Sequence, residues 1–307
     1  MILVTAYESP DLDGSACAYA YAEFLNKTGT SAVAAISGEM HKEANFVFDK
    51  FNIPKLPNAE DFVASSNGIV LVDSSELLAI SNKIEPKKVI EIIDHRKAND
   101  AAKFLNAKLQ IELVGSCATL ISERFYMKGV EPSKESAILL YSAIVSNTIN
   151  FKNNITSNRD RKMAEYLKSK IELPKNYVSE MFAFKSKLDG SLEEIFDADL
   201  AKVRINGKLF IILQLEINGV EEFAKKNMPV LEAVFGRIKK KESADYIFAT
   251  LIDIEKAFNL FICFDDETKV ILENALKIKF TRNLSKREGI LMRKEIIPKL
   301  KESFVGN

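Results

Sequence analysis

The chain has 307 residues, more than a typical single domain, so we expect two domains that each bury a core. Its 43 Lys and Arg residues balance its 43 Asp and Glu residues, and this balance argues against duplex nucleic acid or a membrane surface as a partner. No apolar run approaches the roughly 20 residues of a membrane span, and the first residues lack the pattern of a signal peptide. The cysteines Cys17, Cys117 and Cys263 lie far apart in apolar surroundings, as expected of free thiols in a cytoplasmic protein.

Short apolar runs alternate with helical patterns in the first half of the chain. The runs are ILVTAY, SAVAAI, GIVLVDSS and VIEIIDHR, and the first helical pattern extends from about Gly14 to Lys27. Continuous apolar strands separated by helices are typical of a parallel sheet that is covered on both faces. The predicted fold class is therefore α/β, with an N-terminal doubly wound, mostly parallel sheet whose ligands bind beyond the carboxyl ends of its strands.

The strict alternation ends in the second half. Polar residues and a glycine in KSKLDGSLEEIF indicate a boundary. We therefore expect a first domain at 1–187, a linker at 188–193 and a smaller second domain of the α+β type at 194–307. Asn206 and Gly207 are the turn signal of a β-hairpin within that second domain.

Three of the predicted strands in the first half are followed by acidic residues. A single Asp at a strand end usually caps a helix or makes a turn. Because the carboxyl ends of parallel strands share one edge of a sheet, these side chains can converge, and close carboxylates repel one another unless a cation lies between them. His95 adds an imidazole of the kind that binds transition metals, whereas His41 lies in a polar helical segment and is expected to be solvated. The sequence predicts a divalent metal site, with Asp11, Asp13, Asp73, Glu76, Asp94 and His95 as candidates.

Seven motifs occur in an order that resembles one superfamily over nearly the whole chain. They are SPDLDGSACA, GEMHKEANFVFDKFNIPKLP, LVDSSE, IIDHRKAN, VGSCATLI, SAIVSNTINF and GILMRKEIIPKL. Together they resemble the DHH phosphoesterase superfamily, in particular the family II, manganese-dependent inorganic pyrophosphatases with their exopolyphosphatase and prune-like relatives. The resemblance implies a DHH metal-binding domain, a C-terminal substrate-binding domain and an active site in the cleft between them.

The same resemblance implies roles for individual residues. Asp11, Asp13, Asp73 and His95 match metal ligands, and Asp73 is the expected bridge between two ions of Mn²⁺ or Mg²⁺, with a single ion as the alternative. Asp73, His95 and Arg96 are the expected catalytic residues. The expected substrate-binding residues, which hold a small anionic phosphate compound, are Arg293, Lys294, Lys202 and Ser116. Homodimerisation through an edge of the first domain is also implied.

The sequence departs from the family pattern at four positions. Tyr7 replaces the first family histidine and Asn147 replaces the Asp of the Ser-Asp-Thr motif, so both are weak candidates for metal ligands. The second histidine of Asp-His-His is either replaced by Arg96, which cannot transfer a proton at neutral pH, or deleted, since DHRKAN is one residue shorter than the family run. A family lysine aligns with Ala201, which leaves the neighbouring Lys202 as its substitute.

These observations predict a metal-dependent phosphohydrolase that cleaves a phosphoanhydride bond. Inorganic pyrophosphate, converted to two phosphates by metal activation of water, is the leading substrate. An exopolyphosphatase or a nucleotide phosphodiesterase of the same superfamily is one alternative. A catalytically weakened protein that binds phosphate compounds is the other, because ligand changes commonly cost ~10 to 100-fold in metal affinity or activity.

Overall fold

The computed structural model describes residues 1–96, 100–188, 190–198 and 200–305 and contains two compact units. The first comprises Met1–Phe151 and Ile155–Met181, and the second comprises Lys152–Asn154 and Phe182–Asn307. The division after Met181 precedes the linker that we expected at 188–193, of which residue 189 lies outside the described residues. Leu188 and Leu192, which both lie in that segment, pack against the hydrophobic core of the second unit, so the chain has already joined that unit there.

The first unit contains a five-stranded, wholly parallel sheet with the strand order β2-β1-β3-β4-β5. Its strands are β1 (Ile2–Thr5), β2 (Ala32–Ala34), β3 (Gly68–Val72), β4 (Val89–Asp94) and β5 (Lys108–Ile111). All five residues of β3 are buried, as expected for a central strand that is covered on both faces. The predicted doubly wound parallel sheet is confirmed.

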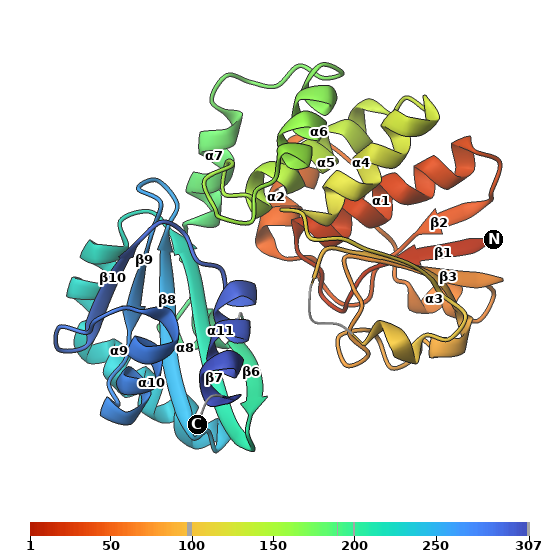
Figure 1. Ribbon diagram of the computed structural model, residues 1–307. Coiled ribbons are helices and arrows are strands. Elements are labelled where there is room, and N and C mark those ends of the chain that lie inside the picture. The colour runs from red at the N-terminus through yellow and green to blue at the C-terminus, as the bar shows by residue number, and fades with distance from the viewer. Residues whose placement is uncertain (97–99, 189, 199, 306–307) are drawn as a thin grey trace. The chain divides into compact units, whose positions relative to one another are not determined.

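Helices cover the two faces of this sheet unequally (Figure 1). One face carries α1, which contacts β1, and α4, which contacts β4. Both helices pack on α5, and α4 also packs on α6. The other face is closed by the short helix α3 and by loops that bring Ile80, Ile84 and Phe104 onto Ile69 and Leu71. The helices are α1 (Leu12–Lys27), α2 (Lys42–Lys50), α3 (Glu60–Val63), α4 (Cys117–Lys128), α5 (Lys134–Asn147), α6 (Asn158–Lys168) and α7 (Tyr177–Lys185), with the short 3₁₀ turns η1 (Pro86–Lys88) and η2 (Ala101–Lys103).

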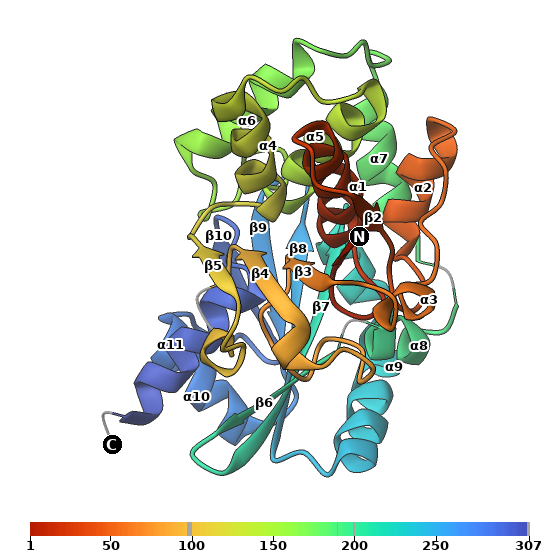
Figure 2. The ribbon, with the colours of Figure 1, turned by 90° about the vertical axis from the view of Figure 1, so that its right-hand side faces the viewer.

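The second unit contains a mixed five-stranded sheet with the strand order β10-β9-β8-β7-β6 (Figure 2). Its strands are β6 (Leu200–Ile205), β7 (Lys208–Ile217), β8 (Tyr246–Asp253), β9 (Phe258–Ile262) and β10 (Leu284–Glu288). Only the pairing of β7 with β8 is parallel among these described strands. The predicted hairpin joins β6 to β7, and its turn residues Asn206 and Gly207 both have positive φ, which is why these two residue types occur there.

Two pairs of helices enclose the second sheet. The first pair, α8 (Leu192–Ala198) and α9 (Val220–Glu242), packs on one face through Phe196, Leu231 and Phe235. The second pair, α10 (Asp266–Leu276) and α11 (Arg293–Val305), packs on the other through Leu272 and Ile296. Among the described residues, no helix combines the length and the apolar character needed to cross a membrane.

Candidate metal centre

Asp13, Asp73 and His95 converge at the carboxyl edge of the first sheet. Asp13 lies in the first turn of α1, Asp73 directly follows β3, and His95 directly follows β4. Each offers one ligand atom, and these atoms all lie within 4.8 Å of one another. All three side chains are buried. The topology of the parallel sheet therefore brings together residues that are far apart in the chain, as the sequence predicted.

Asp13 is the most extensively anchored member of this cluster. Its Oδ1 accepts hydrogen bonds from Ser116 Oγ at 2.8 Å and from the Ala118 backbone N–H at 2.9 Å. Its Oδ2 accepts from the Cys117 backbone N–H at 2.8 Å and from Asn147 Nδ2 at 2.5 Å. Burial, followed by the negative charge of the nearby carboxylate, raises the pKa of Asp13 to about 7 in the absence of an ion.

The surroundings of His95 fix which of its ring nitrogens faces the two acids. Nδ1 lies 2.9 Å from the backbone oxygen of Val114, which can only accept a hydrogen bond, so Nδ1 carries the proton. In the neutral ring, Nε2 then presents its lone pair to Asp73 Oδ1 at 3.3 Å and to Asp13 Oδ2 at 3.7 Å. Three electron-rich atoms at such distances are mutually unfavourable without a cation, and a carbonyl on the opposite nitrogen is the usual support of a metal-binding histidine.

Arg96 and Tyr7 lie on the other side of Asp73. Arg96 Nη2 is 3.5 Å from Asp73 Oδ2, and its guanidinium lies over the ring of Tyr7 with 5.1 Å to the ring centre. The Tyr7 hydroxyl accepts a hydrogen bond from the Asp11 backbone N–H at 3.0 Å, and burial raises the pKa of its phenol well above the ordinary value. Tyr7 therefore stays neutral beside the cluster. Residues 97–99, which complete the IIDHRKAN motif, lie outside the described residues.

Several predicted site residues hold the cluster in place. Asp11 caps α1, since its Oδ1 accepts from the backbone N–H groups of Asp13 and Gly14 at 2.8 and 3.0 Å. Asp94 Oδ1 accepts the backbone N–H of His95 at 2.7 Å, and its Oδ2 accepts the Ser75 hydroxyl. The hydroxyl of Ser116 donates to Asp13, and its expected contact with substrate stays a prediction.

Other candidates from the sequence do not join the cluster. Glu76 and His41 are exposed, and the expectation of a solvated His41 is confirmed. The three cysteines are free and buried, as predicted.

In the second unit, Arg293 and Lys294 open α11, and the Arg293 backbone N–H donates to Gln214 Oε1 at 3.2 Å. Ala201 packs on the same face of the sheet as α11. Because side chains alternate along a strand, Lys202 points to the opposite face, where its Nζ lies 2.5 Å from Glu242 at the end of α9. Lys202 thus lies on the face opposite to α11, and its role as a substitute for the family lysine stays a prediction.

The sequence interpretation missed Asp160, a fully buried residue of α6. Its carboxylate accepts the Gly115 backbone N–H at 3.0 Å and the Thr119 hydroxyl at 2.6 Å, and both donors flank the start of α4. Ser157 and Asp160 also form a capping box at the start of α6. The Ser-x-x-Asp spacing was a visible signal for a helix start, but it carried no signal for the contact with α4.

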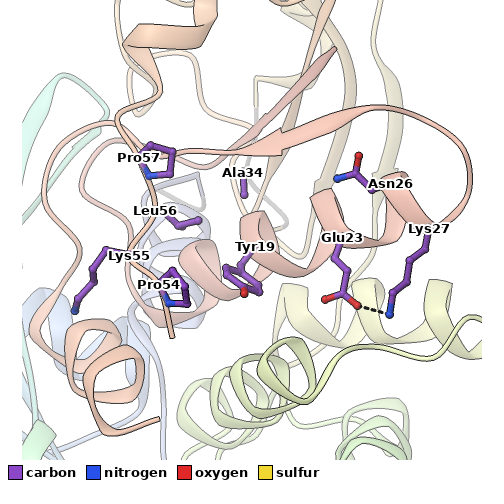
Figure 3. Close-up of a pocket in the computed structure, with 9 residues that line it drawn as sticks. All are labelled: Tyr19, Glu23, Asn26, Lys27, Ala34, Pro54, Lys55, Leu56 and Pro57. Carbon is purple, nitrogen blue, oxygen red and sulfur yellow. Dashed lines mark ion pairs between the residues drawn. The ribbon is translucent and has the colours of Figure 1, made fainter. Parts of the chain in front are cut away.

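A cavity of about 600 Å³ lies elsewhere on the first unit (Figure 3). Tyr19, Glu23 and Lys27 of α1 line it on one side, and the segment 54–57 lines it on the other. None of the metal-cluster residues contributes to its walls. The cavity is therefore separate from the candidate metal centre.

Comparison with known proteins identifies the family. A family model described as the N-terminal domain of the DHH family matches residues 1–144. A probable manganese-dependent inorganic pyrophosphatase from Clostridium acetobutylicum is 31% identical over 314 residues, which cover 100% of this chain and 99% of that protein. This chain belongs to the manganese-dependent inorganic pyrophosphatase family. A second member, from Methanothrix thermoacetophila, is 31% identical over 99% of this chain and 98% of its own.

A solved structure supports the same family assignment at the level of the fold. The Methanococcus jannaschii protein assigned to the family II inorganic pyrophosphatases matches with a TM-score of 0.79 and 28% identity, and 100% of each chain is covered. The expected membership of the DHH superfamily and of its pyrophosphatase family is thus confirmed. Tyr7, Arg96 and Asn147 surround the cluster of Asp13, Asp73 and His95, and all three side chains contact cluster residues or their neighbours.

Proposed function

We propose that this protein hydrolyses inorganic pyrophosphate to two phosphates and that it uses Mn²⁺ held by Asp13, Asp73 and His95. The observation that carries the proposal is the convergence of two buried carboxylates and an imidazole Nε2 at one point of the sheet edge. The names of the two relatives, both manganese-dependent inorganic pyrophosphatases, supply the metal and the substrate.

The donor set fits Mn²⁺ on chemical grounds. Carboxylate oxygens suit Mn²⁺, and an imidazole adds a nitrogen ligand that first-row transition metals accept. The Nε2 lone pair of His95 and the two carboxylates beside it form an electron-rich pocket that a divalent cation neutralises. The hydrogen bonds on Asp13 and on His95 Nδ1 fix the orientation of both ligands before an ion binds.

The reaction needs no nucleophilic side chain. Water attacks one phosphorus, the bond from that phosphorus to the bridging oxygen breaks, and both products are phosphate. A bound divalent cation would act as a Lewis acid that lowers the pKa of the attacking water and neutralises charge on the leaving phosphate. Arg96, held over Tyr7, offers a planar fork to a phosphate oxygen of the substrate, and we assign further phosphate binding to Arg293 and Lys294.

One ion, rather than two, agrees best with the surroundings of Asp73. A second cation held through Asp73 Oδ2 would be repelled by the guanidinium of Arg96, whose Nη2 lies 3.5 Å from that oxygen. The remaining acid on that side, Asp11, uses Oδ1 to cap α1. Arg96 thus supplies a permanent positive charge beside Asp73 Oδ2.

Phosphate release from pyrophosphate by the purified protein tests the proposal. Pyrophosphate, tripolyphosphate and a cyclic dinucleotide are compared in Mn²⁺, Mg²⁺ and Co²⁺, with Asp73→Ala as the inactive control. We expect fastest turnover of pyrophosphate with Mn²⁺ and its loss in Asp73→Ala. Preference for tripolyphosphate or the dinucleotide would make the protein an exopolyphosphatase or a phosphodiesterase, and no turnover of any substrate would leave a phosphate-binding protein.

A further inference from the structure

We propose that Asp160 is a positioning residue for the metal cluster, which it controls through the start of α4 without touching the cluster itself. The inference rests on the proposed Mn²⁺ site, because Asp160 acts on the ligand Asp13. Asp160 is fully buried, and a buried carboxylate is costly unless donors surround it.

The partners of Asp160 come from two different segments. On its own helix, Asp160 Oδ2 accepts the Ser157 backbone N–H at 2.7 Å and the Ser157 hydroxyl at 2.6 Å. From the region of α4, its carboxylate accepts the Gly115 backbone N–H and the Thr119 hydroxyl. One side chain therefore fastens the start of α6 to the start of α4, 45 residues away along the chain.

The segment that Asp160 fastens is the one that holds Asp13. Gly115 and Thr119 bracket Ser116, Cys117 and Ala118, and each of these three donates a hydrogen bond to the Asp13 carboxylate. A shift of the α4 start would lengthen all three bonds at once. The position of the metal ligand is thus set by a carboxylate that lies behind its donors.

Close packing adds a second connection between Asp160 and Asp13. A Cβ atom at Gly115 would lie 3.0 Å from Asp160 Cγ and 2.6 Å from Thr148 Cγ2, so Gly115 packs tightly against both residues. Thr148 follows Asn147, whose Nδ2 is the fourth donor to Asp13. Asp160 and the segment that carries Asn147 therefore both pack against Gly115, next to the residues that donate to Asp13.

The test compares Asp160→Asn and Asp160→Ala with matched variants of Asp253. Asp253 is also a buried aspartate, and it accepts the backbone N–H groups of Gly219, Val220 and Lys256 in the second unit. Its variants lose comparable bonds far from α4 in the chain, so they control for a general loss of stability. Thermal unfolding establishes that each variant is folded, and Asp160→Asn, which keeps the shape of the side chain, carries the test if Asp160→Ala does not fold.

Two readouts are made on the full chain. Hydrogen exchange of the peptide 114–121 reports the Cys117 and Ala118 amides that bind Asp13, and calorimetry reports Mn²⁺ affinity. We expect the amides of Cys117 and Ala118 to exchange faster in the Asp160 variants than in wild type, and these variants to bind Mn²⁺ about 10 to 100-fold more weakly. The Asp253 variants should keep the wild-type exchange rates and the wild-type Mn²⁺ affinity.

Two results would overturn the inference: wild-type exchange of the 114–121 amides in both Asp160 variants, or equal losses of Mn²⁺ affinity in the Asp160 and Asp253 variants. A wild-type protein that binds no Mn²⁺ would instead refute the proposed function, and the exchange comparison would still decide the role of Asp160.

Discussion

Asp13 shows how a single residue links the fold to the pH dependence of the site. Its pKa lies at about 7 in the metal-free folded chain, against an ordinary value of 3.8, because it is buried beside a second carboxylate. Mn²⁺ must displace this proton, so affinity should rise by about tenfold per pH unit up to pH 7 and then level off. Calorimetric titrations at pH 5.5, 6.5 and 7.5 would show this, and an affinity independent of pH would contradict it.

The raised pKa of Asp13 also affects the stability of the metal-free protein, which falls with pH where the affinity for Mn²⁺ rises. The folded state binds the Asp13 proton more tightly than the unfolded state, so this group makes the protein less stable as pH rises from about 4 to about 7. Above pH 7 its effect is constant. Saturating Mn²⁺ should remove this trend, and denaturant unfolding with and without Mn²⁺ across that range measures the difference.

At the level of elements, the start of α4 needs a glycine for steric reasons. A Cβ at Gly115 would collide with Thr148 and press on Asp160, so Gly115→Ala should destabilise the protein by ~1–3 kcal/mol and weaken Mn²⁺ binding. Gly236 in α9 is the matched control, because a Cβ there meets nothing within 4 Å. Gly236→Ala should stabilise the helix by about 0.5–1 kcal/mol. Denaturant unfolding measures both changes, and a neutral Gly115→Ala would show that this packing is unimportant.

Elements were predictable from the sequence where local chemistry decides them. The apolar runs predicted the four strands β1 to β4 of the first sheet, and Asn206-Gly207 predicted the hairpin of the second, whereas the edge strand β5 was not predicted. The first helix begins at Leu12 rather than at Gly14, because Asp11 caps it. Lys202 could not be assigned from the sequence, since one step along a strand reverses the face and only the partner Glu242 shows which face it takes.

At the level of the whole molecule, β5 is an edge strand of the first sheet. Leu105, Leu109 and Leu113 on and beside it are more than half exposed, and an exposed apolar edge strand tends to associate with another chain. We propose that a second copy of the chain covers this edge. Light scattering should give the mass of a dimer, and Leu109→Lys should give a monomer, whereas Val270→Lys on α10 should leave the dimer intact. A monomeric wild type would contradict the proposal.

Metal-ligand candidates were more predictable than the residues that support them. Asp13, Asp73 and His95 each follow or lie just beyond an apolar strand, so the parallel topology alone brings them to one edge. Asp160, Ser116 and Asn147 act through contacts between segments far apart in sequence, and no local pattern encodes such pairings.

The dependence of pyrophosphate hydrolysis on Mn²⁺ concentration, compared between wild type and His95→Gln, tests the central claim most directly. His95→Gln removes the imidazole Nε2 and leaves both carboxylates in place. We predict that wild-type turnover saturates with Mn²⁺ and that His95→Gln needs about 10 to 100-fold more Mn²⁺ for half-maximal activity. Turnover without a divalent metal, or an unchanged Mn²⁺ requirement in His95→Gln, would contradict the assignment of this cluster as the metal centre.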